Sequence, residues 1–413
     1  MVKRMSWVTP ATMAIGLAGV VAAEPGDLLV SAFVSDNLVA FNEWTGDAIG
    51  PYTGAGADLD GTLGVTLGPD GLVYVASEDA NMVLRFDPET RAFVDRFVWD
   101  DPDTPEDETG GLAGPSSVLF ATDGSLLVGS FDSDAVLRYD GSTGAFVEVF
   151  VASGSGGLNG PDAGKAFGPD GRLYIPSYWS NAILRYDGAT GAFVDAFVPP
   201  NGSGLRRPRQ VLFRNGLMYV SCEFTNRVMR FDATTGAYVD DFVDPALSGL
   251  RAPTGIGFGP DGGFYVGSAG TDEVLQFDGV TGAYLGIFLD GAAAGLDTIT
   301  FIYFLPTDGL RVSPALPGVA GVANRVIAAN AAPGERVAIA YGFAQGRTPI
   351  PGCGGVAVDL ENARLLAGGL ADDDGRFETS GAVPIAAQGR VVRLQAAALD
   401  RCVTSAVSLT EFE

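Results

Sequence analysis

Any chemistry that this chain performs has to proceed without histidine. The 413 residues include 50 acidic and 25 basic residues and no histidine. Histidine is the commonest general base and the commonest metal ligand, so its absence removes both and excludes a Ser-His-Asp site. The available functional groups are carboxylates, arginines and aromatic rings, which suit cation binding, ion pairing and stacking against sugars or peptides.

Carboxylates and aromatic rings gather in six short, similar segments: SAFVSD, ASEDAN, GSFDSD, PSYWSN, SCEFTN and GSAGTD. Each ends in Asn or Asp, at Asp36, Asn81, Asp134, Asn181, Asn226 and Asp272. Because this residue recurs in every segment, we interpret it as a turn former whose side chain bonds its own backbone. Residues that differ between the segments are the better candidates for ligand contact, namely Tyr178, Trp179, Glu223 and Phe224.

Four carboxylates are candidate ligands for Ca²⁺ or another divalent cation. Glu78, Asp79 and Asp132 lie in the same segments, and Asp162 lies near the start of a predicted strand. Carboxylate oxygens are the preferred ligands of hard divalent cations.

Two connections carry unusual charge. The segment WDDPDTPEDETGG holds six acids between Asp100 and Glu108, whereas GLRRPRQ and GLRAP supply Arg206, Arg207, Arg209 and Arg251, with Lys165 one repeat earlier. If these connections share one face, the acidic side would take a cation and the basic side an anionic group. The alternative is a solvated acidic loop together with arginines that pair with neighbouring carboxylates.

These segments belong to a repeat. The phrase NAILRYDGATGAFVDAFV at 181 aligns without gaps to segments that begin at 36, 81, 134, 226 and 272, at intervals of 45 to 53 residues. Each copy predicts a hairpin with a turn at Thr-Gly, and most are preceded by a second hairpin at Asp-Gly or Asn-Gly. The arginines of the shared LR[FY]D motif (Arg85, Arg138, Arg185 and Arg230) recur and are predicted to belong to the scaffold.

Four antiparallel strands in about 45 residues are typical of a propeller blade, since one small sheet must stack on its neighbours to bury its faces. Six repeats predict a six-bladed β-propeller over residues 24–310. Residues 26–33 lack a preceding inner strand, and residues 297–309 contain one with nothing after it. We therefore expect residues 298–305 to pair with residues 27–33 and close the ring.

The pattern x-P-x-G-I-x-F-x-P-D-G-x-x-Y-V, followed by V-L-R-F-D and T-G, resembles the NHL and gluconolactonase-type six-bladed propellers over about residues 26–309. This resemblance implies a fold that serves lactonases, lyases and pure binding modules. Gluconolactonase-type propellers hold a divalent metal with Glu, Asn and Asp side chains. The Glu expected near the start of an inner strand is missing here, where Asp162 and Asp297 are the carboxylates.

After Pro314 the blade pattern stops. Alternating strands separated by Pro, Gly and Asp clusters predict an immunoglobulin-like β-sandwich over residues 311–413. Cys353 and Cys402 both lie in this segment and are predicted to form a disulfide. Cys222 ends an apolar strand pattern and is predicted to be a small buried residue.

The N-terminus has the layout of a secretory signal peptide. Lys3 and Arg4 precede an apolar run from Ala11 to Ala23, which is short for a retained membrane anchor. We expect cleavage after Ala23 and a secreted, extracellular or cell-surface protein, with the periplasm as an alternative. Without residues 1–23 the net charge is −27, which disfavours nucleic acid and anionic membrane surfaces as partners.

Together these features predict an exported, monomeric binding module. Its ligand would be an extracellular protein or peptide, a glycan or an anionic small molecule held on the turn face, with Ca²⁺ as an optional partner. One alternative is a metal-dependent lactonase or esterase that uses Glu78, Asp132, Glu223 and Asp162. Another alternative is a structural spacer that presents the C-terminal domain.

Overall fold

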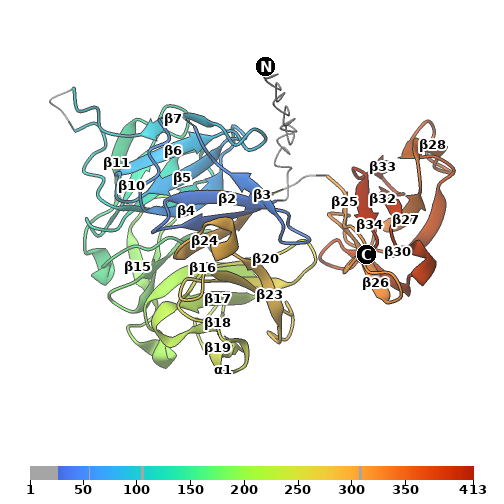
Figure 1. Cartoon of the computed structure of the whole chain (residues 1–413). Coiled ribbons are helices and arrows are strands. Elements are labelled where there is room, and N and C mark those ends of the chain that lie inside the picture. Colours follow the sequence, from blue (N-terminus) through green and yellow to red (C-terminus); the bar gives the residue numbers. More distant parts are fainter. Residues whose placement is uncertain (1–26, 55, 104–106, 307–308) are drawn as a thin grey trace, which may run out of the picture.

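The computed structural model describes residues 27–54, 56–103, 107–306 and 309–413. The predicted signal peptide and residues 104–106 of the acidic connection lie outside the described residues. The described chain is almost entirely β-structure, with one short α-helix, α1 (Pro245–Ser248) (Figure 1). It contains no helix with the length and apolarity that crossing a bilayer requires.

Six four-stranded antiparallel sheets form the first 280 or so described residues, and we number them as blades 1 to 6 in chain order. Within each blade, strands A to D run from the centre outward. Blade 1 comprises β24 (Ile299–Phe304), β1 (Leu28–Ala32), β2 (Asn37–Phe41) and β3 (Ala48–Pro51). Blade 2 comprises β4 (Thr62–Leu67), β5 (Val73–Ser77), β6 (Met82–Phe86) and β7 (Phe93–Val98). Blade 3 comprises β8 (Pro115–Phe120), β9 (Leu126–Ser130), β10 (Ala135–Tyr139) and β11 (Phe146–Val151). Blade 4 comprises β12 (Ala166–Phe167), β13 (Leu173–Ser177), β14 (Ala182–Tyr186) and β15 (Phe193–Val198). Blade 5 comprises β16 (Pro208–Arg214), β17 (Leu217–Cys222), β18 (Arg227–Asp232) and β19 (Tyr238–Val243). Blade 6 comprises β20 (Pro253–Phe258), β21 (Phe264–Ser268), β22 (Glu273–Phe277) and β23 (Tyr284–Asp290).

The two ends of this region share blade 1. β24 pairs antiparallel with β1, and Leu28 lies opposite Phe304 while Val30 lies opposite Ile302. The predicted pairing of residues 298–305 with residues 27–33 is therefore confirmed, as is the all-β propeller fold. The last strand of this region thus supplies the inner strand that blade 1 would otherwise lack, and it joins the two ends of the ring.

Aromatic contacts join neighbouring blades. The ring of Tyr74 on strand B of blade 2 lies 5.0 Å from Phe97 on strand D of its own blade. The same ring lies 4.9 Å from Phe120 on strand A of blade 3. Both contacts are edge-to-face, a geometry that stabilises aromatic pairs beyond simple burial. Equivalent tyrosines in blades 4, 5 and 6 make corresponding contacts, so the recurring Tyr holds adjacent sheets together.

The recurring arginines have a scaffold role, as predicted. Arg85 pairs with Asp95 on the adjacent strand D through two hydrogen bonds of 2.8 and 2.5 Å, and its guanidinium lies 4.6 Å from the Phe97 ring centroid. Arg185 and Arg230 repeat this arrangement with Asp195 and Asp240, and Arg138 pairs with Glu148. These side chains hold strands C and D together on the outer part of blades 2 to 5.

The Asn or Asp that ends each B–C turn links one blade to the next. All six adopt a left-handed backbone conformation, with φ between 53° and 57°. Each side-chain oxygen accepts a hydrogen bond of 2.6–2.9 Å from a backbone N–H just before strand A of the following blade. The turn-forming prediction is correct. The predicted bond to the residue's own turn is formed by Asn181, whose amide donates to the Trp179 carbonyl at 3.5 Å, but the recurrent bond of all six residues is to the next blade. This recurrent bond satisfies a neighbouring N–H that the ring geometry brings within reach.

Removing one of these links is expected to destabilise the propeller. Asn81→Ala deletes the acceptor for Gly114 N–H and places a residue with a Cβ but no polar group at positive φ. We expect the free energy of unfolding to fall by about 1–2 kcal/mol in chemical denaturation. Asn81→Asp is the matched control, because Asp occupies this position in three other blades. Equal losses for both variants would contradict the proposed role of the side-chain oxygen.

The C-terminal region consists of two main sheets and a hairpin. One sheet orders β25 (Arg311–Val312), β26 (Ala323–Ala329) and β31 (Phe377–Ala382), and the other joins β30 (Arg364–Leu370), β27 (Arg336–Gly342), β32 (Val391–Ala398), β33 (Val403–Thr404) and β34 (Ser408–Glu411). The hairpin pairs β28 (Gln345–Pro349) with β29 (Ala357–Leu360). Val326 and Ala328 of the first sheet share a core with Val337, Ile339 and Leu394 of the second.

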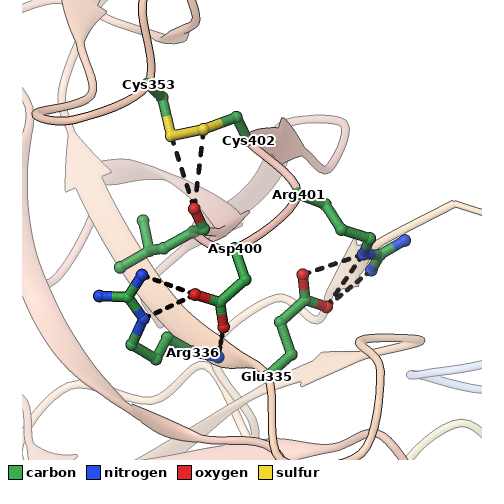
Figure 2. Close-up of a disulfide and its surroundings, with 7 residues drawn as sticks. Glu335, Arg336, Cys353, Asp400, Arg401 and Cys402 are labelled. Atoms are coloured by element: carbon green, nitrogen blue, oxygen red, sulfur yellow. Dashed lines mark hydrogen bonds and ion pairs between the residues drawn. A yellow bond between two sulfur atoms is a disulfide. The ribbon is translucent and has the colours of Figure 1, made fainter.

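The predicted disulfide is present in this region. Cys353 and Cys402 are joined, and two ion pairs lie beside the bond (Figure 2). Arg401 donates to buried Glu335, and these hydrogen bonds hold the pKa of the glutamate below its ordinary value. Cys222 is the free cysteine and is buried in strand B of blade 5, where burial raises its thiol pKa to about 12. Its prediction as a buried structural residue is confirmed.

Loss of the disulfide is expected to affect the C-terminal region alone. Replacing Cys353 and Cys402 by serine should lower its free energy of unfolding by about 2–5 kcal/mol, because the bond restricts the unfolded chain. In calorimetry, the unfolding transition of the C-terminal region should move to a lower temperature in the double variant, while the transition temperature of the propeller should not change. A reductant should reproduce the shift in the native protein and have no effect on the double variant.

The C-terminal region contacts the propeller on the face opposite the B–C turns. Arg214 of β16 lies 2.8 Å from Asp374, and Arg376 donates a 2.8 Å hydrogen bond to the carbonyl of Asp261 in the A–B turn of blade 6. Trp44 in the C–D turn of blade 1 packs with Ile327 and Ala329. These contacts leave the B–C turn face of the propeller uncovered by the C-terminal region.

Candidate functional site

A single cavity of about 440 Å³ lies at the centre of the B–C turn face. Each blade contributes the residue three positions before its recurrent Asn or Asp. In order from blade 1 to blade 6, these residues are Phe33, Glu78, Phe131, Tyr178, Glu223 and Ala269. The cavity volume falls in the range that holds small molecules or the end of a longer chain.

Residues at or near the start of the inner strands form the deeper wall. They are Leu63, Asp162, Arg209, Thr254 and Thr300. Blade 4 is irregular here, because its strand A is reduced to Ala166–Phe167. Ala163, just before that strand, packs in a core cluster with Val65 and Phe301 of blades 2 and 1. The segment around Ala163 therefore reaches from blade 4 to the inner strands of blades 1 and 2.

Arg209 is the central cation of this site. One of its terminal nitrogens, Nη1, lies 3.3 Å from a carboxylate oxygen of Asp162 and 3.3 Å from one of Glu223. The hydroxyl of Tyr178 donates a 2.9 Å hydrogen bond to the other oxygen of Glu223. The side chain of Asp162 is almost fully buried, which makes its pairing with Arg209 costly to disrupt.

The carboxyl groups outnumber the cations, and burial changes their protonation. Burial raises the pKa of Glu78 to about 7, with further contributions from the charges of Asp162, Asp132 and Asp79, while Arg209 opposes the increase. Burial also raises the pKa of Asp162 to about 6, although Arg209 and a backbone hydrogen bond from Ala163 act in the other direction. The site therefore gains and loses protons between about pH 6 and 7, a range that surface carboxylates do not reach.

Lys165 lies in the channel wall and contributes no ion pair to the cavity. Its ammonium nitrogen donates hydrogen bonds of 3.0 and 2.7 Å to the carbonyl and hydroxyl oxygens of Ser117. Burial lowers the pKa of this lysine well below its ordinary value. Lys165 does not line the cavity, so this geometry does not favour the predicted contact between Lys165 and a ligand.

An aromatic rim stands beside the cavity. The guanidinium of Arg207 lies 5.2, 5.1 and 5.5 Å from the ring centroids of Tyr178, Trp179 and Phe224. It also lies 3.6 Å from a carboxylate oxygen of Glu223. Trp179 and Phe224 are 51% and 64% exposed, so each leaves much of its ring surface open to a ligand.

The structure brings together six of the predicted site residues: Glu78, Asp162, Tyr178, Trp179, Arg209 and Glu223 all line the cavity. Arg207 and Phe224 lie next to them. Arg206 and Arg251 are exposed and do not line it. Asp79 and Asp132 are also outside the lining and influence Glu78 through their charges.

The predicted site, with acidic residues on one side and arginines on the other, does not match the observed ion pairs. Arg207 and Arg209 are paired with Glu223 and Asp162 in the middle of the site, as in the alternative weighed above. The described part of the acidic connection binds its own backbone, since Asp101 accepts from Asp103 N–H and Asp107 from Thr109 N–H.

The four candidate metal ligands, Glu78, Asp79, Asp132 and Asp162, do not form a ligand set. Among the described residues, no group of three or more His, Cys, Asp or Glu side chains is placed to hold a metal ion. Asp79 and Asp132 do not line the cavity, and the buried carboxylate of Asp162 is paired with the Arg209 guanidinium.

Phe33, Phe131, Thr254, Thr298 and Thr300 line the cavity and were not among the predicted residues. A signal for the first two exists in the sequence, because they occupy the turn position that supplies Glu78, Tyr178 and Glu223. The threonines carry no comparable signal, since inner-strand residues of one type can face the channel or the neighbouring sheet.

Comparison with known proteins supports the fold. No protein-family model and no curated protein matches the chain. A solved structure of a protein of unknown function from Bacteroides caccae is 14% identical with a TM-score of 0.51, and the match covers 68% of this chain and 98% of that chain. A chain of a nidogen/laminin complex is 14% identical with a TM-score of 0.53, covering 68% and 98%. A periplasmic gluconolactonase from Pseudomonas aeruginosa is 16% identical with a TM-score of 0.47, covering 68% and 99%. The first two of these structures share the fold with this chain, and at these identities the likeness is one of fold alone.

Proposed function

We propose that this protein is an exported binding module that holds a small polar ligand, or the end of a glycan or peptide chain, in the cavity of its B–C turn face. The observation that carries the proposal is convergence: one variable turn residue from each of six blades meets the others at a single cavity. Aromatic rings at its rim supply stacking surfaces, and buried carboxyl groups and Arg209 supply directional polar contacts.

Export is supported by the disulfide and by the N-terminal sequence. The bond between Cys353 and Cys402 is expected to persist in an oxidising compartment outside the cytoplasm. The strongly acidic composition suits an extracellular or periplasmic protein that remains soluble and avoids nucleic acid.

Binding accounts for the site better than metal-dependent hydrolysis of lactones or esters. Such a hydrolase would need several oxygen ligands around one ion, and the described residues contain no group of three or more His, Cys, Asp or Glu side chains placed to supply them. The spacer alternative leaves the convergence of aromatic and ionisable side chains on one cavity without a role.

The proposal is tested by affinity selection with mass spectrometry. The purified protein would be equilibrated with mixtures of neutral oligosaccharides, short peptides and small metabolites, and the retained compounds identified. Trp179→Ala removes the exposed ring at the cavity, and Tyr284→Ala removes a partly exposed ring from the outer strand of blade 6 as the matched control. We expect retention to fall at least tenfold in Trp179→Ala and to persist in Tyr284→Ala. Failure to retain any compound, or equal retention by both variants, would refute the proposal.

A further inference from the structure

The cavity has an excess of acidic groups. Its lining includes the carboxyl groups of Glu78, Asp162 and Glu223 and one cation, Arg209. The neighbouring charged side chains do not restore the balance, because Asp79 and Asp132 act on Glu78 from one side and Arg207 pairs with Glu223 on the other. Lys165 is directed to Ser117.

The polar groups at the deep wall are incompletely satisfied. Asp162 is 1% exposed, and its Oδ2 atom has no hydrogen-bond partner although Arg209 lies 3.3 Å away. The Nε atom of Arg209 is also buried without a hydrogen-bond partner. A buried charged group that lacks a hydrogen bond costs free energy. A ligand that donates a hydrogen bond to the Asp162 carboxylate would remove this cost.

Aromatic rings form much of the remaining surface. Phe33, Phe131, Tyr178 and Trp179 line the cavity from blades 1, 3 and 4. Phe131 packs against Tyr178 and Trp179 at centroid distances of 5.9 and 6.5 Å, which fixes the three rings as one group. Ring faces attract organic cations and accommodate the apolar carbon atoms attached to them.

These features discriminate among ligand classes. An anion would meet three carboxyl groups, and a metal ion would find no set of three His, Cys, Asp or Glu ligands among the described side chains. A neutral sugar could stack on the rings but would leave the charge excess uncompensated. An ammonium group compensates the charge, donates hydrogen bonds to carboxylates and interacts favourably with aromatic faces.

We infer that the ligand of this cavity carries a protonated amine on an apolar or aromatic group, with Glu78 and Asp162 facing the ammonium and the rings of Phe131, Tyr178 and Trp179 holding the carbon part. This inference rests on the proposed function, because it specifies the chemistry of a ligand bound at the same site.

Amine binding should weaken as the pH falls. An alkylammonium stays charged across pH 6–8, whereas Glu78, with a pKa of about 7, takes up a proton in this range. The groups that set this pKa are Asp162, Asp132, Asp79 and Arg209, apart from burial itself. If the ammonium requires the ionised carboxylate, its affinity falls about tenfold between pH 8 and pH 6.

The test uses titration calorimetry of the whole mature protein with three matched probes: phenethylamine, 2-phenylethanol and 3-phenylpropionate. At pH 8 we expect the amine to bind at least tenfold more tightly than the alcohol and the carboxylate not to bind. Nα-acetyl-lysine methylamide, measured in parallel, separates a free amine from a lysine side chain as the source of the ammonium. Glu78→Gln should weaken phenethylamine about tenfold at pH 8, leave 2-phenylethanol unchanged and reduce the pH dependence to about twofold.

The outcomes separate this inference from the proposed function. Equal or tighter binding of the alcohol or carboxylate, with loss in Trp179→Ala, would keep the cavity as a binding site and overturn the preference for an amine. Absence of amine binding at millimolar concentration, or an unchanged amine affinity in Glu78→Gln, would also overturn it. If the Trp179→Ala variant retained every compound of the affinity selection as well as the native protein does, the proposed function itself would be overturned.

Discussion

Glu78→Gln is expected to stabilise the protein by about 3 kcal/mol at pH 8.5 and by less than about 1 kcal/mol at pH 5. Glu78 is charged at the higher pH although its surroundings favour the protonated form, mainly because the side chain is buried and secondarily because Asp162 is close. Glutamine keeps the shape of the side chain and removes the charge. The measurement is urea unfolding at each pH.

The direction follows from proton binding. The pKa of Glu78 rises from 4.5 to about 7 on folding, so the native state binds more protons than the unfolded chain between these values. The stability that this proton contributes is fully present below pH 4.5 and is lost as the pH rises through 7. Glutamine does not ionise, so the Glu78→Gln variant does not lose this stability. The difference in free energy of unfolding between the variant and the native protein therefore grows as the pH rises from 4.5 to 7.

A matched control is available in the same blade. Glu89 lies exposed in the C–D turn, and Glu89→Gln should leave the free energy of unfolding within about 0.5 kcal/mol of the native protein at both pH values. If Glu78→Gln gave the same small change at pH 5 and pH 8.5, the buried acidic character of the cavity would be refuted. A stabilising substitution in a cavity wall is the expected sign of a residue kept for binding rather than for folding.

Arg209→Met is expected to lower the free energy of unfolding by about 3–5 kcal/mol at pH 8. Methionine fills a similar volume but leaves the almost fully buried Asp162 without its cation, and it also removes a partner of Glu223. The loss should shrink towards pH 5, because the pKa of Asp162, already about 6, rises further without Arg209 and the protonated acid is less costly to bury.

Two further variants define the cause of this loss. Asp162→Asn combined with Arg209→Met removes both charges, and most of the lost stability should return if the unpaired carboxylate is responsible. Arg209→Lys keeps a cation and should cost less than methionine at pH 8. A double variant no more stable than Arg209→Met alone would show that packing of the guanidinium, rather than its charge, is what the fold requires.

The sequence alone determined the repeat and most of its consequences. Six similar phrases with β-strand alternation and Gly-containing turns specify small antiparallel sheets, and the missing inner strand at one end with a spare strand at the other specifies closure between β24 and β1. The disulfide followed from two cysteines in one segment of a chain whose N-terminus predicts export. Tyr178, Trp179 and Glu223 were found because they vary at a turn whose other positions repeat.

Only the tertiary structure decided which of the variable residues meet and in what charge state. Arg206 and Arg207 are adjacent in sequence, yet Arg206 is exposed and does not line the cavity, whereas Arg207 lies over three aromatic rings. Asp79, Asp132 and Trp179 occupy the same position of the repeated turn, yet only Trp179 lines the cavity. Composition could not show that Asp162 and Glu223 share Arg209. Local patterns are set by neighbours along the chain, whereas burial, ion pairing and pKa depend on groups that come from different blades and meet only when the ring closes.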